Sequence, residues 1–156
     1  MRIGFSKDIH RLEEGIPLML GGVNVPSLLG PVAHSDGDVV LHVISEAILG
    51  ALAKGDLGTH FPDTIRRTKG MASSVIVDGV MAIMEKEGYS IGNVDVFVSL
   101  ERPKIGHLSE IIAANVAYLL KSDNKQVSIK FGTNEELGPV GEGKAIAAYA
   151  VVLLVK

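Results

Sequence analysis

Eleven consecutive apolar residues, from Ala145 to Val155, constrain the fold of this chain more than any other segment. A membrane-spanning helix needs roughly 20 such residues, so this run is too short to cross a bilayer. A short apolar run that follows a glycine-rich segment is typical of a strand in the core of a sheet. We therefore expect residues 145–155 to form a buried strand.

The remaining sequence alternates between apolar segments and loops rich in glycine and proline. Its periodicity predicts strands at 1–10, 94–100 and 127–131, a hairpin at 17–26, and helices at 39–53, 71–88 and 107–121. Loops are expected at 27–38, 54–69 and 132–144. Asp36 or Asp38 is available as the N-cap of the first helix. This order predicts a single α+β domain over residues 1–156, with a mixed β-sheet and helices packed on one face.

Composition narrows the possible partners. Apolar residues make up 47% of the chain, so we expect copies of it to bury part of that surface, with a well-filled monomer core as the alternative. With a net charge of -3, 4% aromatic residues and no tryptophan, no nucleic-acid partner is expected. Cysteine is absent, which excludes thiolate metal sites. The N-terminus lacks the apolar segment of a signal peptide, so we expect a cytoplasmic protein without a membrane partner.

Polar residues gather in two segments near the N-terminus, Asp8-Ile9-His10 and the segment from His34 to His42. Residues i and i+2 of a strand point to the same side, so Asp8 and His10 converge. His42 would approach them from the first turns of the predicted 39–53 helix. A carboxylate and two imidazoles can hold a divalent transition metal and leave one coordination position free. From spacing alone, a hydrogen-bonded structural cluster is an equal alternative, with His42 satisfied by Glu46.

These segments resemble the 2-C-methyl-D-erythritol 2,4-cyclodiphosphate synthase family of the non-mevalonate isoprenoid pathway. The most specific motif is Ser35-Asp36-Gly37-Asp38, and the likeness continues in order over essentially the whole chain. The further motifs are Gly55-Asp56-Leu57-Gly58, Phe61-Pro62-Asp63-Thr64, Lys69-Gly70, Gly92-Asn93-Val94-Asp95, Pro103-Lys104 and Thr133-Asn134-Glu135-Glu136-Leu137-Gly138. The resemblance implies a metal-dependent lyase that cyclises 4-diphosphocytidyl-2-C-methyl-D-erythritol 2-phosphate and releases CMP.

The resemblance also implies a role for individual residues. Asp8, His10 and His42 would bind Zn²⁺, and Glu135 would help to bind a Mg²⁺ or Mn²⁺ that bridges the diphosphate. His34 and Thr133 would act in catalysis by stabilising the developing phosphate charge. The residues expected to bind the substrate are His34, Ser35, Asp56, Leu57, Gly58, Phe61, Pro62, Asp63, Thr64, Ile65, Leu100, Glu101, Arg102, Pro103, Lys104, Ile105, Gly106, Gly132, Thr133, Asn134 and Glu135.

In the family, the cytidine pocket lies between neighbouring subunits of a homotrimer. The resemblance therefore implies a homotrimer with active sites between subunits, which agrees with the apolar excess. Two other functions compete with this one: a metal-dependent phosphoesterase that uses water as the nucleophile, and a non-catalytic zinc-stabilised oligomer that binds nucleotides. His60 and His107 match no ligand position in the family, and we expect both to be structural or surface residues.

Outside the three metal ligands the sequence departs from the family pattern at several places. Lys7 lies beside the expected centre, and we expect it to face solvent because Ser6 and Asp8 point the other way. The other departures are Ser6 in place of glycine, Ile65 in place of an acid, Glu101 and Arg102 in place of small residues, and Gly132 in place of threonine.

The largest departure lies between Gly138 and Ala145. The family usually carries an aromatic residue, an arginine and a glutamate where this chain has Pro139, Glu142 and Lys144. The family's residues line a cavity on the trimer axis that can hold an isoprenoid diphosphate, and three symmetry-related glutamates would repel such an anion. We expect no saturable binding of geranyl diphosphate in calorimetry. The alternative is that Glu142 and Lys144 form a local pair without consequence for a ligand.

Overall fold

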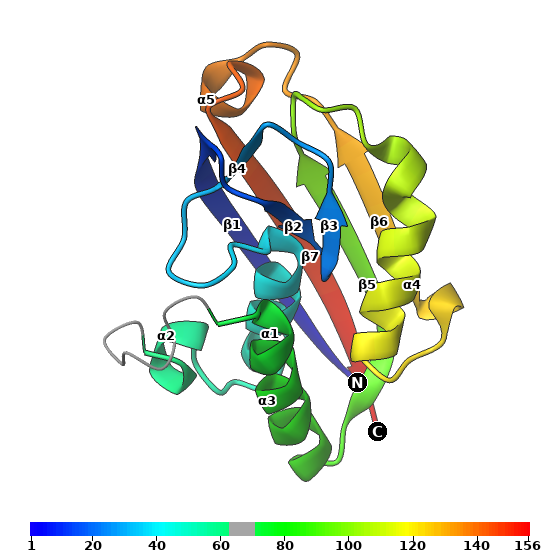
Figure 1. Cartoon of the computed structure of the whole chain (residues 1–156). Coiled ribbons are helices and arrows are strands. Elements are labelled where there is room, and N and C mark those ends of the chain that lie inside the picture. Colours follow the sequence, from blue (N-terminus) through cyan, green and yellow to red (C-terminus); the bar gives the residue numbers. More distant parts are fainter. Residues whose placement is uncertain (63–70) are drawn as a thin grey trace.

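A five-stranded sheet organises the fold of the computed structural model, which describes residues 1–62 and 71–156 (Figure 1). Its strands, in spatial order, are β4 (Leu29–Pro31), β1 (Arg2–Glu14), β7 (Ala145–Val155), β5 (Ser90–Ser99) and β6 (Val127–Gly132). Strands β5 and β6 run parallel and the other neighbours antiparallel, which confirms a mixed sheet. The apolar run 145–155 is strand β7, at the centre of the sheet as its burial requires.

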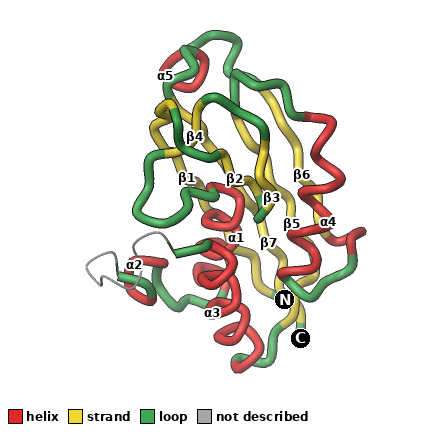
Figure 2. Tube along the Cα trace, in the orientation of Figure 1, coloured by secondary structure: helices red, strands yellow, loops and turns green. Residues whose placement is uncertain are grey.

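Three helices lie on the same face of this sheet, as predicted. Helix α1 (Val39–Ala51) packs on β1 and β7, α4 (Ser109–Leu119) packs on β6, and α3 (Ser73–Lys86) packs against α1. Figures 1 and 2 show all three helices in front of the strands. Nearly every residue of α1 is buried between the sheet and α3. The hydrophobic core therefore lies between the sheet and this helical layer.

The two faces of strand β1 differ in their exposure to solvent. Gly4 and Ser6 face the helical layer and are buried, whereas Ile3, Phe5 and Ile9 face the other way and are exposed. A Cβ atom at Gly4 would lie 1.8 Å from the backbone oxygen of Ala47. The backbones of β1 and α1 can approach this closely because position 4 has no side chain. This approach places α1 beside the helix-facing residues of β1.

A hairpin of β2 (Leu18–Leu20) and β3 (Val23–Val25) lies on the helical side of the sheet, as Figure 1 shows. Its turn residues have φ angles of +59° at Gly21 and +78° at Gly22. A two-residue turn of this kind needs positive φ at both positions, which glycine adopts without strain. The hairpin predicted at 17–26 is confirmed.

The structure differs from the predicted elements where pairing is long-range or an element is short. The predicted 27–38 loop contains β4, which pairs with Leu12 to Glu14 and so extends β1 beyond residue 10. Strand β5 begins at Ser90 instead of 94, with a register shift at Gly92 that interrupts the alternation. The predicted 54–69 and 132–144 loops contain the four-residue helices α2 (Leu57–His60) and α5 (Gly138–Gly141).

The three long helices are shorter than the apolar pattern predicts: α1 ends two residues early, and α3 and α4 lack two predicted residues at each terminus. Helix α1 ends at Ala51 because Ala53 has a φ of +56°, which cannot continue a right-handed helix. Short 3-10 turns at Gly106–Leu108 and Asn124–Gln126 flank α4. Among the helices of residues 1–62 and 71–156, none has the length and apolarity that crossing a membrane requires.

Candidate metal centre

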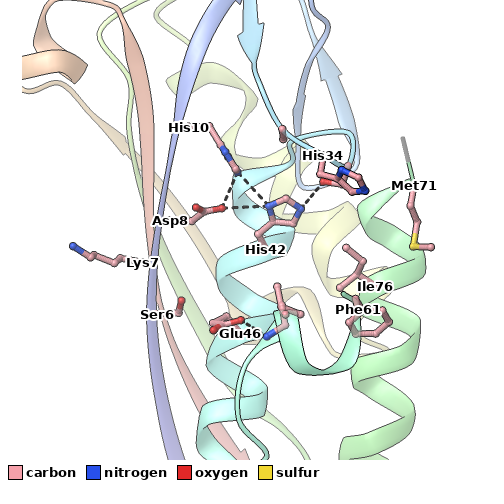
Figure 3. A pocket seen from close by; sticks show the side chains of 14 residues that line it. Ser6, Lys7, Asp8, His10, His34, His42, Glu46, Phe61, Met71 and Ile76 are labelled. Atoms are coloured by element: carbon pink, nitrogen blue, oxygen red, sulfur yellow. Dashed lines mark hydrogen bonds and ion pairs between the residues drawn. The ribbon is translucent and has the colours of Figure 1, made fainter. Parts of the chain in front are cut away.

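Asp8, His10 and His42 meet at one point between β1 and α1 (Figure 3). Asp8 Oδ2 lies 2.9 Å from His10 Nε2 and 3.2 Å from His42 Nδ1, and the two ring nitrogens are 3.4 Å apart. Within the described part of the chain, this is the one group of three histidine or acidic side chains that could hold a metal ion. The three-residue convergence predicted from spacing is confirmed.

The donor atoms are spaced as a tetrahedral zinc ion requires. Zinc bonds to nitrogen and oxygen are about 2.0–2.1 Å long, so two ligand atoms of a tetrahedral site lie about 3.3–3.4 Å apart. The observed separations of 2.9, 3.2 and 3.4 Å fit one ion bound at the centre of the group. No fourth protein ligand joins the group among the described residues, so such an ion would keep an open position.

The two imidazoles control the charge of Asp8. Partial burial opposes ionisation of this carboxyl, but the hydrogen bonds from His10 and then His42 outweigh it and hold the pKa of Asp8 well below its usual range. A carboxylate that stays ionised through the physiological pH range is ready to bind a cation.

His42 is supported from behind by two serine hydroxyls. Its Nε2 lies 2.9 Å from Ser35 Oγ and 3.0 Å from Ser73 Oγ. Glu46, the neighbour considered as a partner from sequence, instead accepts a 2.8 Å hydrogen bond from the backbone N–H of Leu57. Ser73 could not be connected with this centre from its sequence position, because the contact joins residues on separate helices.

Asp38 fixes the segment that carries His42. Its carboxylate is fully buried and accepts hydrogen bonds from the N–H groups of Gly21 (2.9 Å), Gly22 (2.6 Å), Val40 (3.1 Å) and Leu41 (3.0 Å). Burial raises the pKa of Asp38, and the backbone hydrogen bonds oppose that shift. Of the two predicted caps, Asp38 is the N-cap of α1, and it also anchors the β2–β3 turn to the helix.

A pocket of about 340 Å³ opens beside the candidate centre. Figure 3 shows Asp8, His10 and Glu46 on one side of it, and His34, Phe61, Met71 and Ile76 on the other. Five of the residues predicted to bind substrate line this pocket, namely His34, Ser35, Leu57, Gly58 and Phe61. The pocket therefore combines a polar wall that carries possible metal ligands with an apolar wall.

Other residues predicted to bind the substrate near this pocket lie at its margin or outside the described residues. Asp56 is exposed and caps α2 through a 2.8 Å hydrogen bond from the Thr59 N–H. Pro62 precedes three predicted contacts, Asp63, Thr64 and Ile65, which lie outside the described residues. Lys7 is exposed and points away from Asp8, as predicted (Figure 3).

The residues predicted to form a cytidine pocket lie together in the loops that follow β5 and β6. Leu100 N–H donates to the Gly132 carbonyl (3.0 Å), and Asn134 N–H donates to Glu101 Oε2 (3.2 Å). Thr133 Oγ1 donates to Glu135 Oε1 at 3.1 Å. The structure thus brings the 100–106 and 132–135 segments side by side.

Within one chain these loops are separated from the metal group by the width of the sheet. Asp8 is registered with Ala148, Ala148 with Val98, and Val98 with Phe131. Three strand spacings of about 4.8 Å place β6 roughly 14 Å from β1. Glu135, predicted to help bind a second metal, accordingly does not join the three-residue group.

The remaining polar features have local partners. Lys144 Nζ and Glu142 Oε2 form an exposed ion pair at 2.6 Å, as the local-pair alternative for this loop requires. His60 Nε2 lies 2.8 Å from the Lys54 carbonyl, and His107 is exposed on the 106–108 turn. Neither histidine belongs to the metal group.

Comparisons with known proteins agree over the whole length of the chain. The family model described as the YgbB family matches residues 1–155. A 2-C-methyl-D-erythritol 2,4-cyclodiphosphate synthase from Geobacter sulfurreducens is 47% identical over 154 residues, covering 99% of this chain and 98% of that protein. A chloroplastic synthase from Arabidopsis thaliana is 46% identical over 155 residues, covering 99% of this chain and 67% of that protein.

Solved structures of similar proteins share the fold. The CDP-bound form of a 2C-methyl-D-erythritol-2,4-cyclodiphosphate synthase superposes with a TM-score of 0.91 at 37% identity, covering 99% of this chain and all of that one. A Plasmodium falciparum IspF in complex with CDP superposes with a TM-score of 0.86 at 38% identity, covering 99% of this chain and 95% of that one.

Proposed function

The chain belongs to the YgbB family, and from this premise we infer that it is a phosphorus–oxygen lyase of non-mevalonate isoprenoid biosynthesis. It converts 4-diphosphocytidyl-2-C-methyl-D-erythritol 2-phosphate into 2-C-methyl-D-erythritol 2,4-cyclodiphosphate and releases CMP, with residues 1–156 acting as one domain. The observation that carries this proposal is the Asp8–His10–His42 group, which has an open side in the wall of a pocket.

The reaction needs positioning and charge neutralisation more than it needs a protein nucleophile. An oxygen of the substrate's 2-phosphate attacks the β-phosphorus of the same molecule, and the bond from that phosphorus to the CMP oxygen breaks. Because nucleophile and electrophile belong to one substrate, holding the chain in a folded-back conformation lowers the entropy cost of the attack. The 340 Å³ pocket gives the methylerythritol end a place in which to adopt that conformation.

Asp8, His10 and His42 would hold Zn²⁺, which as a Lewis acid would polarise a phosphate oxygen at its open position. His34 stands in the same pocket and would stabilise the phosphate charge that develops during attack. Thr133 would do the same, and Glu135 would help to hold Mg²⁺ or Mn²⁺, which would neutralise charge on the diphosphate. Such neutralisation of charge is what phosphoryl transfer requires.

The proposed contacts divide the substrate between two regions. Ser35, Asp56, Leu57, Gly58 and the segment 61–65 would bind the methylerythritol phosphate part, with Leu57 and Phe61 providing apolar surface in the pocket. The segments 100–106 and 132–135 would bind the cytidine part, largely through backbone groups and Lys104. Their mutual hydrogen bonds support this grouping, because they hold the two loops against each other.

We propose that the active sites lie between the subunits of a homotrimer. The roughly 14 Å between β1 and β6 separates the two substrate regions within one chain, whereas a neighbouring subunit can bring its loops beside the metal group. The face of the sheet opposite the helices, called the open face below, supports this assembly. Ile3 (72%), Phe5 (64%) and Ile9 (58%) are exposed there in the isolated chain. Exposed apolar patches of this kind mark sites of association.

The proposed trimer leads to a testable prediction for a charged substitution on the open face. Replacing Phe5 with aspartate should convert the trimer into monomers, because a charge would have to be buried at the interface. Size-exclusion chromatography with light scattering measures the change. Ile111→Asp is the matched control, since Ile111 is 57% exposed but lies on α4, in the helical layer. A Phe5→Asp protein that remains trimeric would place the interface elsewhere.

Phosphorus NMR of the protein incubated with its substrate, zinc and magnesium tests the proposed activity. We expect the resonances of CMP and of a cyclic diphosphate. Release of inorganic phosphate from the diphosphate would instead indicate a metal-dependent phosphoesterase with water as nucleophile. Absence of turnover with full metal occupancy, accompanied by a lower melting temperature after chelation, would indicate a zinc-stabilised nucleotide-binding oligomer.

A further inference from the structure

Behind His42 lies a chain of hydrogen bonds that reaches Asp36 through Ser73. Ser73 is the first residue of α3 and its side chain is fully buried. Its Oγ lies 3.0 Å from His42 Nε2 and makes a close contact with Asp36 Oδ1. Asp36 also accepts a 2.9 Å hydrogen bond from the Ser73 backbone N–H. The carboxylate therefore holds both the backbone and the hydroxyl of this serine.

These contacts determine the direction of each hydrogen bond. A carboxylate can only accept, so the single hydrogen of the Ser73 hydroxyl must point to Asp36. Ser73 Oγ then offers only lone pairs to His42, so this contact is a hydrogen bond only when Nε2 of His42 donates. A neutral imidazole that carries its hydrogen on Nε2 leaves a lone pair on Nδ1. Nδ1 is the nitrogen that faces Asp8 and His10 (Figure 3).

The second hydroxyl near Nε2 does not impose the same direction. Ser35 Oγ lies 2.9 Å from Nε2 and accepts a 3.2 Å hydrogen bond from the Gly37 N–H. Its own hydrogen has no carboxylate partner among the hydrogen bonds of the described residues, so it can rotate to suit either state of the ring. On the other side of the ring, Asp8 Oδ2 lies 3.2 Å from Nδ1 and favours a hydrogen on that nitrogen. Ser73 and Asp8 therefore favour opposite tautomers of His42 in the metal-free protein.

We propose that Ser73, held by Asp36, is a positioning residue that favours the Nε2–H tautomer of His42 over the Nδ1–H form that Asp8 favours, and so keeps Nδ1 available for the metal ion. The proposal rests on the proposed function, because it takes His42 to be a metal ligand. Outer partners of this kind orient a ligating imidazole, and their loss weakens metal binding by roughly 10- to 100-fold. The chain thereby recruits a residue of α3 to a centre whose ligands lie on β1 and α1.

The test combines nitrogen NMR of the histidine rings with zinc titration of the full-length protein. In chelator-treated protein at mildly alkaline pH, we expect the Nε2–H tautomer of His42 to be populated. Ser73→Ala should shift His42 toward the Nδ1–H form that donates to Asp8, and should raise the zinc Kd by roughly 10- to 100-fold. With zinc at saturation, the KM for the cytidine substrate should stay near the wild-type value, because Ser73 does not line the pocket.

Ser45→Ala provides the matched control. Ser45 lies on α1 one turn beyond His42, is fully buried, and its Oγ has no hydrogen-bond partner among residues 1–62 and 71–156. We expect this variant to keep both the His42 tautomer and the zinc Kd. A wild-type protein without a detectable Nε2–H form of His42 would overturn the proposal even if Ser73→Ala did not fold.

The outcomes separate this inference from the proposed function. If His42→Ala binds zinc as tightly as the wild-type protein, the proposed metal centre is wrong and the role of Ser73 falls with it. If His42→Ala loses zinc binding while Ser73→Ala matches the wild type in tautomer and Kd, the metal centre stands and only the positioning role is wrong.

Discussion

Replacing His42 with alanine is expected to lower kcat/KM for the cyclisation by roughly a thousandfold or more while the fold stays intact. Lewis-acid polarisation contributes several kcal/mol to such reactions, and each 1.36 kcal/mol corresponds to a factor of about ten in rate. Alanine favours the helical conformation, and the Asp38 cap of α1 does not depend on the imidazole. Steady-state release of CMP measures the loss, and circular dichroism reports the fold.

His107→Ala is the control for this prediction. His107 is an exposed histidine on the 106–108 turn and does not belong to the metal group. Its removal should leave the zinc content at the wild-type value. A His42→Ala protein that retains both its zinc and its turnover would show that His42 is not a ligand.

The largest loss of stability is expected from Asp38→Ala. The wild-type carboxylate accepts four backbone hydrogen bonds, two from the Gly21-Gly22 turn and two from the first turn of α1. Alanine would leave these donors without a partner, and an unsatisfied buried donor costs about 1–3 kcal/mol. We expect the free energy of unfolding to fall by about 4 kcal/mol or more, measured by urea denaturation at matched protein concentration.

Asp56→Ala tests why Asp38→Ala should lower stability. It separates the burial of the Asp38 carboxylate from the capping of a helix alone. Asp56 is the N-cap of α2 but is exposed, so water can replace its side chain. Its removal should reduce stability far less than Asp38→Ala does. Equal effects of the two substitutions would mean that the connection from Asp38 to the β2–β3 turn carries little energy.

Features that depend on local chemistry could be predicted from the sequence. The positive φ angles of Gly21 and Gly22 follow from a Gly-Gly pair between apolar runs, and the 145–155 run has no stable place except in the core. The convergence of Asp8 and His10 follows from the two-residue period of a strand. These predictions needed no knowledge of distant contacts, and the structure confirms them.

Features that depend on contacts between distant segments could not be predicted in this way. Strand β4 has only three residues, and its pairing with Leu12 to Glu14 gives it most of its order. Ser73 supports His42 across 31 positions of sequence, and an isolated serine at the start of a helix carries no signal of that contact. The likeness to a known family supplied the metal ligands but did not reveal how their orientation is maintained.

The central place of β7 has a consequence for how this protein folds during synthesis. Its residues pair with β1 on one side, from Arg2↔Leu154 to Arg11↔Ala145, and with β5 on the other, from Ser90↔Val155 to Ser99↔Ala147. On the ribosome, β1 and β5 therefore emerge long before the strand that joins them, and their edges stay unpaired until residues 145–155 are released. Pairing between such distant segments is slow. The central strand β7 is therefore added last, after the helical layer has had time to form.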